Sequence, residues 1–214
     1  MSIAPPASTP KLIRVEYVRG EILLDAERNA DAALAFGRYL AVLPDHPGAR
    51  EGRAAALLAL GRPLEAAHDL DVAIARQKVP LPETYLARAR ALSEAGDAHL
   101  EDAIAGLDAG IALLGPVVTL ERAAIELELR RGNIDAALQR LDGIRVRSAR
   151  QEAWLTQRGE ILERAGRTDE ARAAYVEALS ALDRLPSHRR ETQARRDLEA
   201  KLRGAIQRLS PPGA

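Results

Sequence analysis

Apolar residues recur along this chain with the spacing of helices that bury one face. From Leu12 onward, segments of about 12–15 residues alternate with short breaks. Five of these segments carry apolar or small residues at i, i+4 and i+7, positions that share one side of a helix. The five sets are Ala32/Phe36/Tyr39, Ala66/Leu70/Ala73, Ala103/Leu107/Gly110, Ala137/Leu141/Ile144 and Ala171/Tyr175/Ala178. Because Val/Ile/Thr-rich runs are absent, the pattern predicts an all-α fold.

Each of these segments follows another helical segment with a matching face. There a small or apolar residue is followed three positions later by a larger residue, so the two again share one side of a helix. The pairs are Gly20/Leu23, Ala54/Leu57, Ala89/Leu92, Ile125/Glu128 and Gly159/Leu162. We therefore predict helical hairpins whose two faces pack together and onto the next hairpin.

Four glycines mark the period of these hairpins. Gly61, Gly96, Gly132 and Gly166 follow one another at steps of 35, 36 and 34 residues. A fixed step in this range is typical of stacked-repeat proteins. Glycine can close a helix in the left-handed conformation, and Asn133 or Thr168 can cap the helix that follows. Prolines fall at the breaks between hairpins, where they stop helices.

One segment carries the family resemblance most clearly. Between Trp154 and Ala178 the chain has Gly159, Leu162, Gly166, Ala171 and Tyr175 at tetratricopeptide repeat (TPR) spacings. With five such units in register, the chain resembles the TPR family. The resemblance implies a right-handed α-solenoid of TPR helical hairpins. We assign five repeats within residues 12–185, at 13–46, 47–80, 82–117, 118–151 and 152–185.

The flanks and three local departures complete the predicted organisation. We expect residues 1–11 and 210–214 to be disordered, and residues 186–209 to form an arginine-rich capping helix over the last repeat. The third repeat has two extra residues around Ala98–Leu100, which we predict to form an extended turn. Glu128 stands where the family prefers an aromatic residue or leucine. The first repeat lacks the turn glycine and has Glu27-Arg28-Asn29 instead.

Composition limits the kinds of site that the chain can contain and the cellular compartment that we expect for it. The formal net charge is +0, but residues 1–110 carry 12 basic and 16 acidic side chains, and the remainder carries 19 and 15. The 214 residues include no cysteine, which excludes disulfides and thiolate metal sites. No apolar run is long enough to span a membrane, and no secretion signal is evident. We expect a cytoplasmic protein, or a periplasmic one if a leader was removed.

No motif points to catalysis, to a metal site or to a cofactor. The four histidines, at positions 46, 68, 99 and 188, are scattered, and no third ligand recurs at metal spacing. Phosphate-binding and nucleophile motifs are absent. Two basic clusters, around Arg145 and in the C-terminal helix, lack the aromatic readers of a nucleic-acid site and are diluted by carboxylates. We expect no enzyme activity, no cofactor and no nucleic-acid partner.

The resemblance implies a binding surface instead. In TPR proteins the first helices of successive repeats line a concave groove that holds a peptide. The corresponding positions here are Tyr17, Glu21, Asp25, Glu51, Ala55, Leu86, Arg90, Glu94, Arg122, Glu126, Arg130, Thr156, Glu160 and Arg164. A TPR subgroup that binds the C-terminal carboxylate of heat-shock chaperones uses Lys and Asn where this chain has Tyr17 and Glu21. This departure argues against that function.

Two functions follow from the sequence. The first is a non-catalytic scaffold or adaptor that binds a peptide or a partner protein of unknown identity in the groove. The second is a self-assembling module, because the opposite charge balances of the two halves suit end-to-end contact; we expect a monomer or a weak homo-oligomer. Trp154, the single tryptophan, could be either a core residue or a groove anchor.

Overall fold

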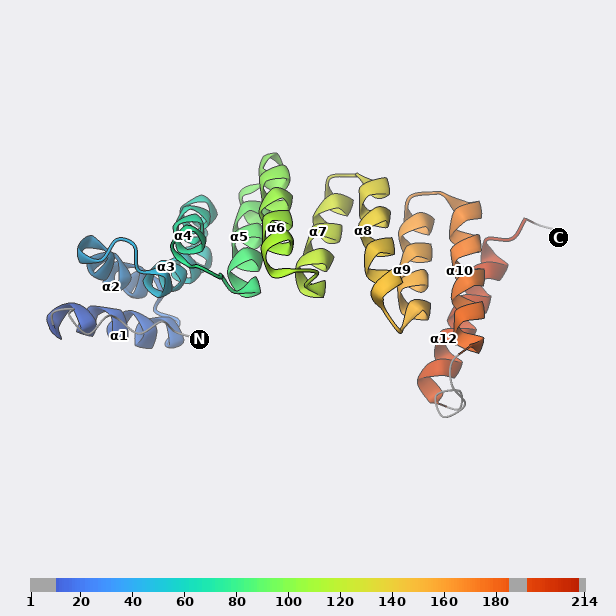
Figure 1. Ribbon diagram of the computed structural model, residues 1–214, viewed down its shortest axis with the longest axis horizontal. Coiled ribbons are helices and arrows are strands. Elements are labelled where there is room, and N and C mark those ends of the chain that lie inside the picture. Colours follow the sequence, from blue (N-terminus) through green and yellow to red (C-terminus); the bar gives the residue numbers. More distant parts are fainter. Residues whose placement is uncertain (1–10, 185–191, 212–214) are drawn as a thin grey trace. The chain divides into compact units, whose positions relative to one another are not determined.

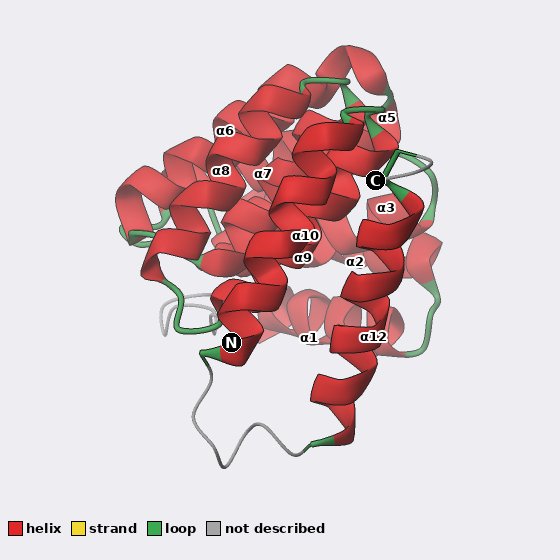
Figure 2. Ribbon diagram, turned by 90° about the vertical axis from the view of Figure 1, so that its right-hand side faces the viewer, coloured by secondary structure: helices red, strands yellow, loops and turns green. Residues whose placement is uncertain are grey.

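The computed structural model describes residues 11–184 and 192–211, and within these ranges it contains α-helices, one short 3-10 helix and no strand (Figures 1 and 2). The all-α prediction is confirmed. The helices are α1 (Lys11–Asp25), α2 (Asn29–Val42), α3 (Pro47–Ala59), α4 (Pro63–Arg76), α5 (Pro82–Ala95), η1 (Asp97–His99), α6 (Leu100–Leu114), α7 (Val118–Arg130), α8 (Ile134–Arg147), α9 (Gln151–Arg164), α10 (Thr168–Asp183) and α12 (Gln193–Arg208). None of the described helices is long and apolar enough to cross a bilayer.

The helices follow one another as five consecutive pairs, α1/α2 to α9/α10, with a short turn inside each pair, and the chain forms two compact units. The units are Met1–Leu127 and Glu128–Ala214, so the boundary falls within α7. In the first unit each helix from α1 to α6 packs against the next one along the chain, and α1 also contacts α3. In the second unit α9 packs against α8 and α10, and α12 packs against α10. The predicted extended turn in the third repeat contains η1.

The residues of the repeating apolar pattern form the core. The alanines that open the second helices, from Ala32 to Ala171, are fully buried. The large residues four positions later are also buried, at 0–2% exposure from Phe36 to Tyr175. Alanine contributes little side-chain volume, so the helices can approach closely and the larger residue of each set fills the space between them. Trp154 is only partly buried.

Glycine and a single glutamate close the first helices of the hairpins. Gly61, Gly132 and Gly166 have φ between 70° and 78°, in the left-handed region. Glu27 occupies the same position in the first hairpin with φ 57°, and no other described non-glycine residue has positive φ. In all four turns the residue that follows this position donates its backbone amide to the carbonyl of the residue five positions before it in the chain, at 2.8–2.9 Å; in the first hairpin, the Arg28 amide donates to the Leu23 carbonyl. Glu27 therefore adopts the left-handed conformation that closes the helix, although its Cβ atom makes this conformation less favourable than it is for glycine.

Side-chain caps follow the sequence expectation only in part. The Asn133 side chain accepts from the Ala136 amide at 3.4 Å, as a cap for α8. Thr168 instead is the first residue inside α10, and its hydroxyl donates to the Gly166 carbonyl at 3.5 Å. An unanticipated cap comes from His46, whose Nδ1 accepts from the Ala49 amide at 3.1 Å.

Glu128, the outlier of the repeat pattern, is buried among arginines. It is 5% exposed, and its carboxylate lies 3.4 Å from Arg140 and 3.8 Å from Arg131. The guanidinium groups compensate part of the cost of burying a charge at a position where related repeats place an apolar side chain.

The C-terminal helix α12 packs against α10. Leu202 and Ala205 are buried. Lys201 pairs with Glu160 at 2.6 Å, and Arg208 pairs with Glu163 at 3.1 Å. The helix begins at Gln193; the predicted start of this segment and the predicted disordered residues 1–10 and 212–214 lie outside the described residues.

Candidate functional site

Two hollows lie along the first helices of the hairpins in the first unit. One, of about 580 Å³, lies between α1 and α3, and the other, of about 850 Å³, lies between α3 and α5. We call them the acidic hollow and the apolar hollow. The sequence-predicted groove residues Tyr17, Glu21 and Asp25 line the first, Leu86 and Arg90 line the second, and Glu51 lines both.

The acidic hollow combines carboxylates with apolar walls. Its carboxylates belong to Glu21, Asp25 and Glu51, and none of the described residues that line it is basic. Val18 and Ile22 stand in its wall and are 48% and 62% exposed. The remaining lining residues are Tyr17, Leu24, Phe36, Gly48 and Gly52. The two glycines on α3 keep this side of the hollow free of bulk.

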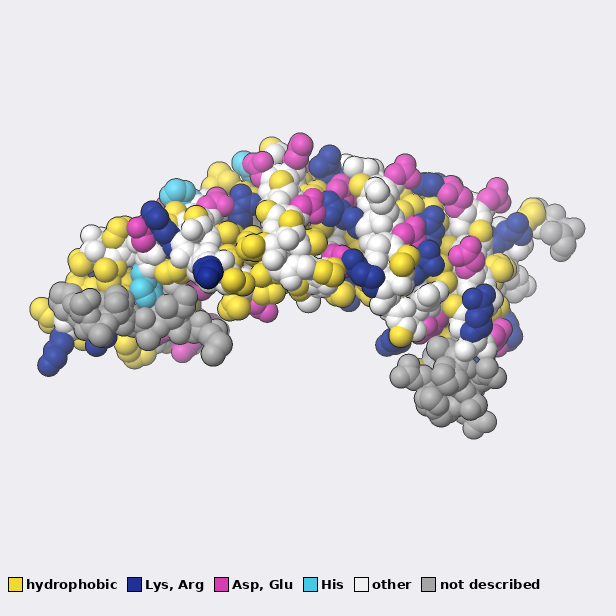
Figure 3. Space-filling view, viewed as in Figure 1, with side chains coloured by type: hydrophobic (Ala, Val, Ile, Leu, Met, Phe, Trp, Pro, Cys, Tyr) yellow, Lys and Arg dark blue, Asp and Glu magenta, His cyan; other side chains and the backbone are white. Residues whose placement is uncertain are grey.

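Small side chains open the apolar hollow. Ala54, Ala55 and Ala59 project from α3, and Ala87 projects from α5. Leu58, Leu70, Leu81 and Leu86 complete the apolar lining, and Glu83, Thr84 and Arg90 provide the polar groups besides Glu51. Leu81 is 44% exposed and Val79 beside it is 62% exposed. Hydrophobic side chains are visible on the surface over α4 and α5 (Figure 3).

Glu51 is held in place where the two hollows meet. One carboxylate oxygen accepts from Gln77 Nε2 at 2.8 Å and from Thr84 Oγ1 at 2.9 Å. Thr84 is itself buried, at 5% exposure. Both bonds use Oε1, and neither uses Oε2. The carboxylate is therefore oriented before any ligand arrives.

Negative charge predominates on the lining of the two hollows. Among the described lining residues the acidic ones are Glu21, Asp25, Glu51 and Glu83, whereas Arg90 is the one basic residue, and it pairs with Glu94 at 2.7 Å. Asp25 and Glu83 form no ion pair with any described residue. The part of the predicted groove in residues 11–95 is thus an acidic surface.

The other predicted groove residues have different surroundings. Arg122, Glu126 and Arg130 are not buried on α7. Glu160 is bound by Lys201 of α12, and Arg164 donates through Nε to the Glu160 carbonyl at 3.2 Å.

Two predicted groove residues are core residues. Tyr17 is 3% exposed, because its ring packs at 5.2–5.9 Å from the rings of Phe36, Tyr39 and His46. Thr156 is 6% exposed, and its hydroxyl donates to the Glu152 carbonyl at 2.7 Å. Tyr17 borders the acidic hollow from the core, but both side chains expose too little surface for us to propose them as contact residues.

Sequence reasoning missed several residues that line the hollows. Val18 and Ile22 follow directly after the predicted positions Tyr17 and Glu21. Leu58 lies three residues after Ala55, on the same side of α3. A prediction that also included the residue after each groove position would have found Val18 and Ile22. A prediction that continued for one more turn along α3 would have found Leu58.

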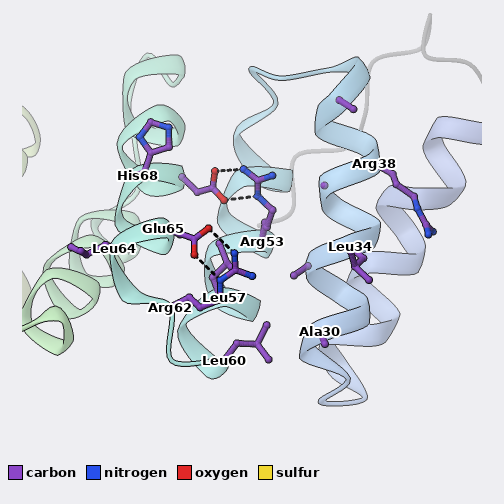
Figure 4. A pocket seen from close by; sticks show the side chains of 14 residues that line it. Ala30, Leu34, Arg38, Arg53, Leu57, Leu60, Arg62, Leu64, Glu65 and His68 are labelled. Carbon is purple, nitrogen blue, oxygen red and sulfur yellow. Dashed lines mark hydrogen bonds and ion pairs between the residues drawn. The ribbon is translucent and has the colours of Figure 1, made fainter.

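A third hollow, of about 930 Å³, lies on the second helices of the first two hairpins (Figure 4). Leu57 and Leu60 lie between α2 and α4, with Ala30 and Leu34 on the α2 side. Its charged groups mostly pair with one another. Asp69, 1% exposed, accepts from Arg50 and Arg53 at 2.6 Å, and Glu65 pairs with Arg62 at 2.6 Å. The hydrogen bond from Arg62 holds the pKa of Glu65 below its usual value.

The described residues offer no group of three or more His, Cys, Asp or Glu side chains that could hold a metal ion. The hollows between first helices combine exposed apolar walls with carboxylates, and hydrogen bonds hold the carboxylate of Glu51 in place.

Comparison with known proteins identifies the fold. The chain is similar to the MamA protein, with a TM-score of 0.65 and 17% identity over 80% of this chain and 92% of that one. It is similar to YrrB, described as a TPR protein with an unusual peptide-binding site, with a TM-score of 0.59 and 11% identity over 88% and 90%. For PilF of Pseudomonas aeruginosa the TM-score is 0.54, at 16% identity over 94% and 93%.

At these identities the structural similarities show the fold alone. No curated protein matches the chain. The family model described as a tetratricopeptide repeat-like domain matches residues 85–203, which is more than half of the sequence. The chain therefore belongs to the tetratricopeptide repeat-like family.

Proposed function

We propose that this protein is a non-catalytic scaffold that binds a peptide segment of a partner protein along the first helices of its hairpins. The observation that carries the proposal is the pair of hollows that flank α3 and meet at Glu51. Together they offer a ligand a continuous path from α1 to α5. YrrB, a protein of the same fold that is described as having a peptide-binding site, lends support.

The geometry favours a chain segment over a small molecule. Both hollows are open and line successive helices, whereas small-molecule sites bury most of their ligand in one concavity. A stacked-repeat protein offers a long surface for an extended partner.

Filling the apolar hollow tests this proposal. Ala55 is exposed on α3 and lines the hollow, so Ala55→Phe should occupy the ligand's space without disturbing the core. Ala75 is an exposed alanine on α4 that lines none of the hollows described above, and Ala75→Phe is the matched control.

The readout is capture of partner proteins from a lysate of the source organism. We expect a partner that wild type and Ala75→Phe retain and that Ala55→Phe loses. Equal retention by all three proteins would refute binding through the apolar hollow. Unchanged far-ultraviolet circular dichroism of both variants is the control for folding.

Self-association is the second candidate function, and an exposed apolar stripe on α1 favours it. Leu12, Val15, Val18 and Ile22 are 83%, 59%, 48% and 62% exposed, and their spacing places them on one side of the helix. Light scattering at high protein concentration tests this candidate. A dimer that Val15→Glu dissociates would support it, and a monomer at every concentration would exclude it.

A further inference from the structure

The acidic hollow has the chemistry of a site for a long cationic side chain. Lysine and arginine carry an apolar stem and a charged head, and they place the stem on apolar surface while the head meets water or a counter-charge. Here Val18 and Ile22 offer exposed apolar surface, and Glu21 and Asp25 offer the carboxylates. The same hollow disfavours an acidic side chain, because its described lining contains carboxylates and no basic residue.

The apolar hollow next to it has the chemistry of a site for a large aliphatic or aromatic side chain. Alanines on α3 and α5 leave its volume of about 850 Å³ open, and leucines form its sides. Its cation Arg90 is engaged by Glu94, so a ligand carboxylate would have to compete with an existing ion pair.

Glu51 fixes the distance between the two sites. It borders both hollows, whose α3 residues share one broad face of that helix: Gly48 and Gly52 near its start line the acidic hollow, and Ala54 to Ala59 near its end line the apolar hollow. The α3 residues of the two hollows lie about six positions apart along the helix, and a rise of about 1.5 Å per residue makes this step about 9 Å. An extended chain covers about 3.3–3.6 Å per residue, and about three residues therefore span the step from one hollow to the next.

We propose that the ligand of this surface is a peptide segment with an arginine or lysine in the acidic hollow and, about three residues away, a large apolar side chain in the apolar hollow. This inference rests on the proposed function and adds the class of ligand. It draws above all on Asp25, a carboxylate that has no ion-pair partner among the described residues.

Defined peptides test the ligand class directly. The probes are fluorescein-labelled, end-blocked peptides of about ten residues. The first carries two adjacent arginines and a leucine three residues later in a Gly/Ser background. The second replaces the arginines with glutamates, and the third replaces the leucine with serine. Fluorescence anisotropy reports binding of each peptide to the full chain.

Two protein variants complete the experiment. Glu21→Gln/Asp25→Asn removes two charges from the acidic hollow while keeping side-chain shape. Glu101→Gln/Glu177→Gln removes two charges from exposed positions on α6 and α10, and it is the matched control for net charge.

We expect wild type to bind the Arg/Leu peptide about tenfold or more tightly than the Glu/Leu and Arg/Ser peptides. Exposed ion pairs contribute modestly, so the Glu21→Gln/Asp25→Asn variant should bind the Arg/Leu peptide about fivefold to tenfold more weakly. The control variant should bind it as wild type does. Affinity should also fall with added salt, less steeply in the neutralised variant.

Two results would overturn the inference. One is equal affinity for the Arg/Leu and Glu/Leu peptides, and the other is an affinity that the Glu21→Gln/Asp25→Asn change leaves unaltered. Absence of binding even at about 1 mM Arg/Leu peptide would overturn it as well. Each of these results leaves the Ala55→Phe capture experiment to decide separately whether the surface binds any partner, so failure of the ligand class is distinct from failure of the proposed function.

Discussion

Replacing Glu27 with glycine should stabilise this protein. Glu27 has φ 57°, whereas the corresponding positions of the second, fourth and fifth hairpins hold glycine at φ 70–78°. The turn is otherwise the same, since the Arg28 amide donates to the Leu23 carbonyl at 2.8 Å. Only the side chain of Glu27, beginning with its Cβ atom, distinguishes the strained turn from the relaxed ones.

The size of the effect follows from three contributions. A left-handed conformation costs a non-glycine residue about 1–2 kcal/mol. Glycine lowers the stability by about 0.5–1 kcal/mol, because it makes the unfolded chain more flexible and therefore loses more conformational entropy on folding. Removing a carboxylate from the C-terminal end of α1 adds a few tenths of a kcal/mol. We therefore expect Glu27→Gly to raise the free energy of unfolding by about 1 kcal/mol, and Tm by about 2–4 °C.

Urea titration followed by circular dichroism measures this difference, and Glu27→Ala separates its causes. Alanine removes the carboxylate but keeps the Cβ atom, so it should change stability by only a few tenths of a kcal/mol. Gly61→Ala, at φ 70°, should destabilise the second hairpin by about 1 kcal/mol. If Glu27→Ala stabilises as much as Glu27→Gly, the charge and not the backbone is responsible, and the conformational argument fails.

Three further substitutions test the packing and the electrostatics. Asp69→Asn should cost about 3 kcal/mol in urea titrations, because it leaves two partly buried guanidinium groups without their carboxylate; a loss under about 1 kcal/mol would show that water compensates. Gly52→Ala should destabilise by about 1–2 kcal/mol in thermal unfolding, because a Cβ atom there would lie 2.5 Å from the Phe36 ring; unchanged stability would mean that the ring can move. The hydrogen bond from Tyr175 lowers the pKa of Glu163, so stability gained above the unfolded pKa of about 4.3 should be lost as the pH falls below it. Tyr175→Phe should flatten this pH dependence, and an identical pH profile in the variant would contradict the assignment.

How much of the candidate site the sequence could predict depends on the kind of residue. The resemblance to the TPR family predicted Glu51, Leu86 and Arg90 as groove residues, and all three line the apolar hollow. The same reasoning included Tyr17, which is buried. Its burial depends on Phe36, Tyr39 and His46, and no local period shows which residues meet around one ring.

The sequence by itself determined the all-α fold, the register of the hairpins and their glycine turns. These features repeat with a fixed step, and each depends on contacts within one or two neighbouring helices. Tertiary structure alone decided that Lys201 of α12 binds Glu160 and that Asp25 forms no ion pair with the described residues. The physical reason is that a side chain's partners come from segments far away in sequence, so its availability to a ligand is settled only when those segments are in place.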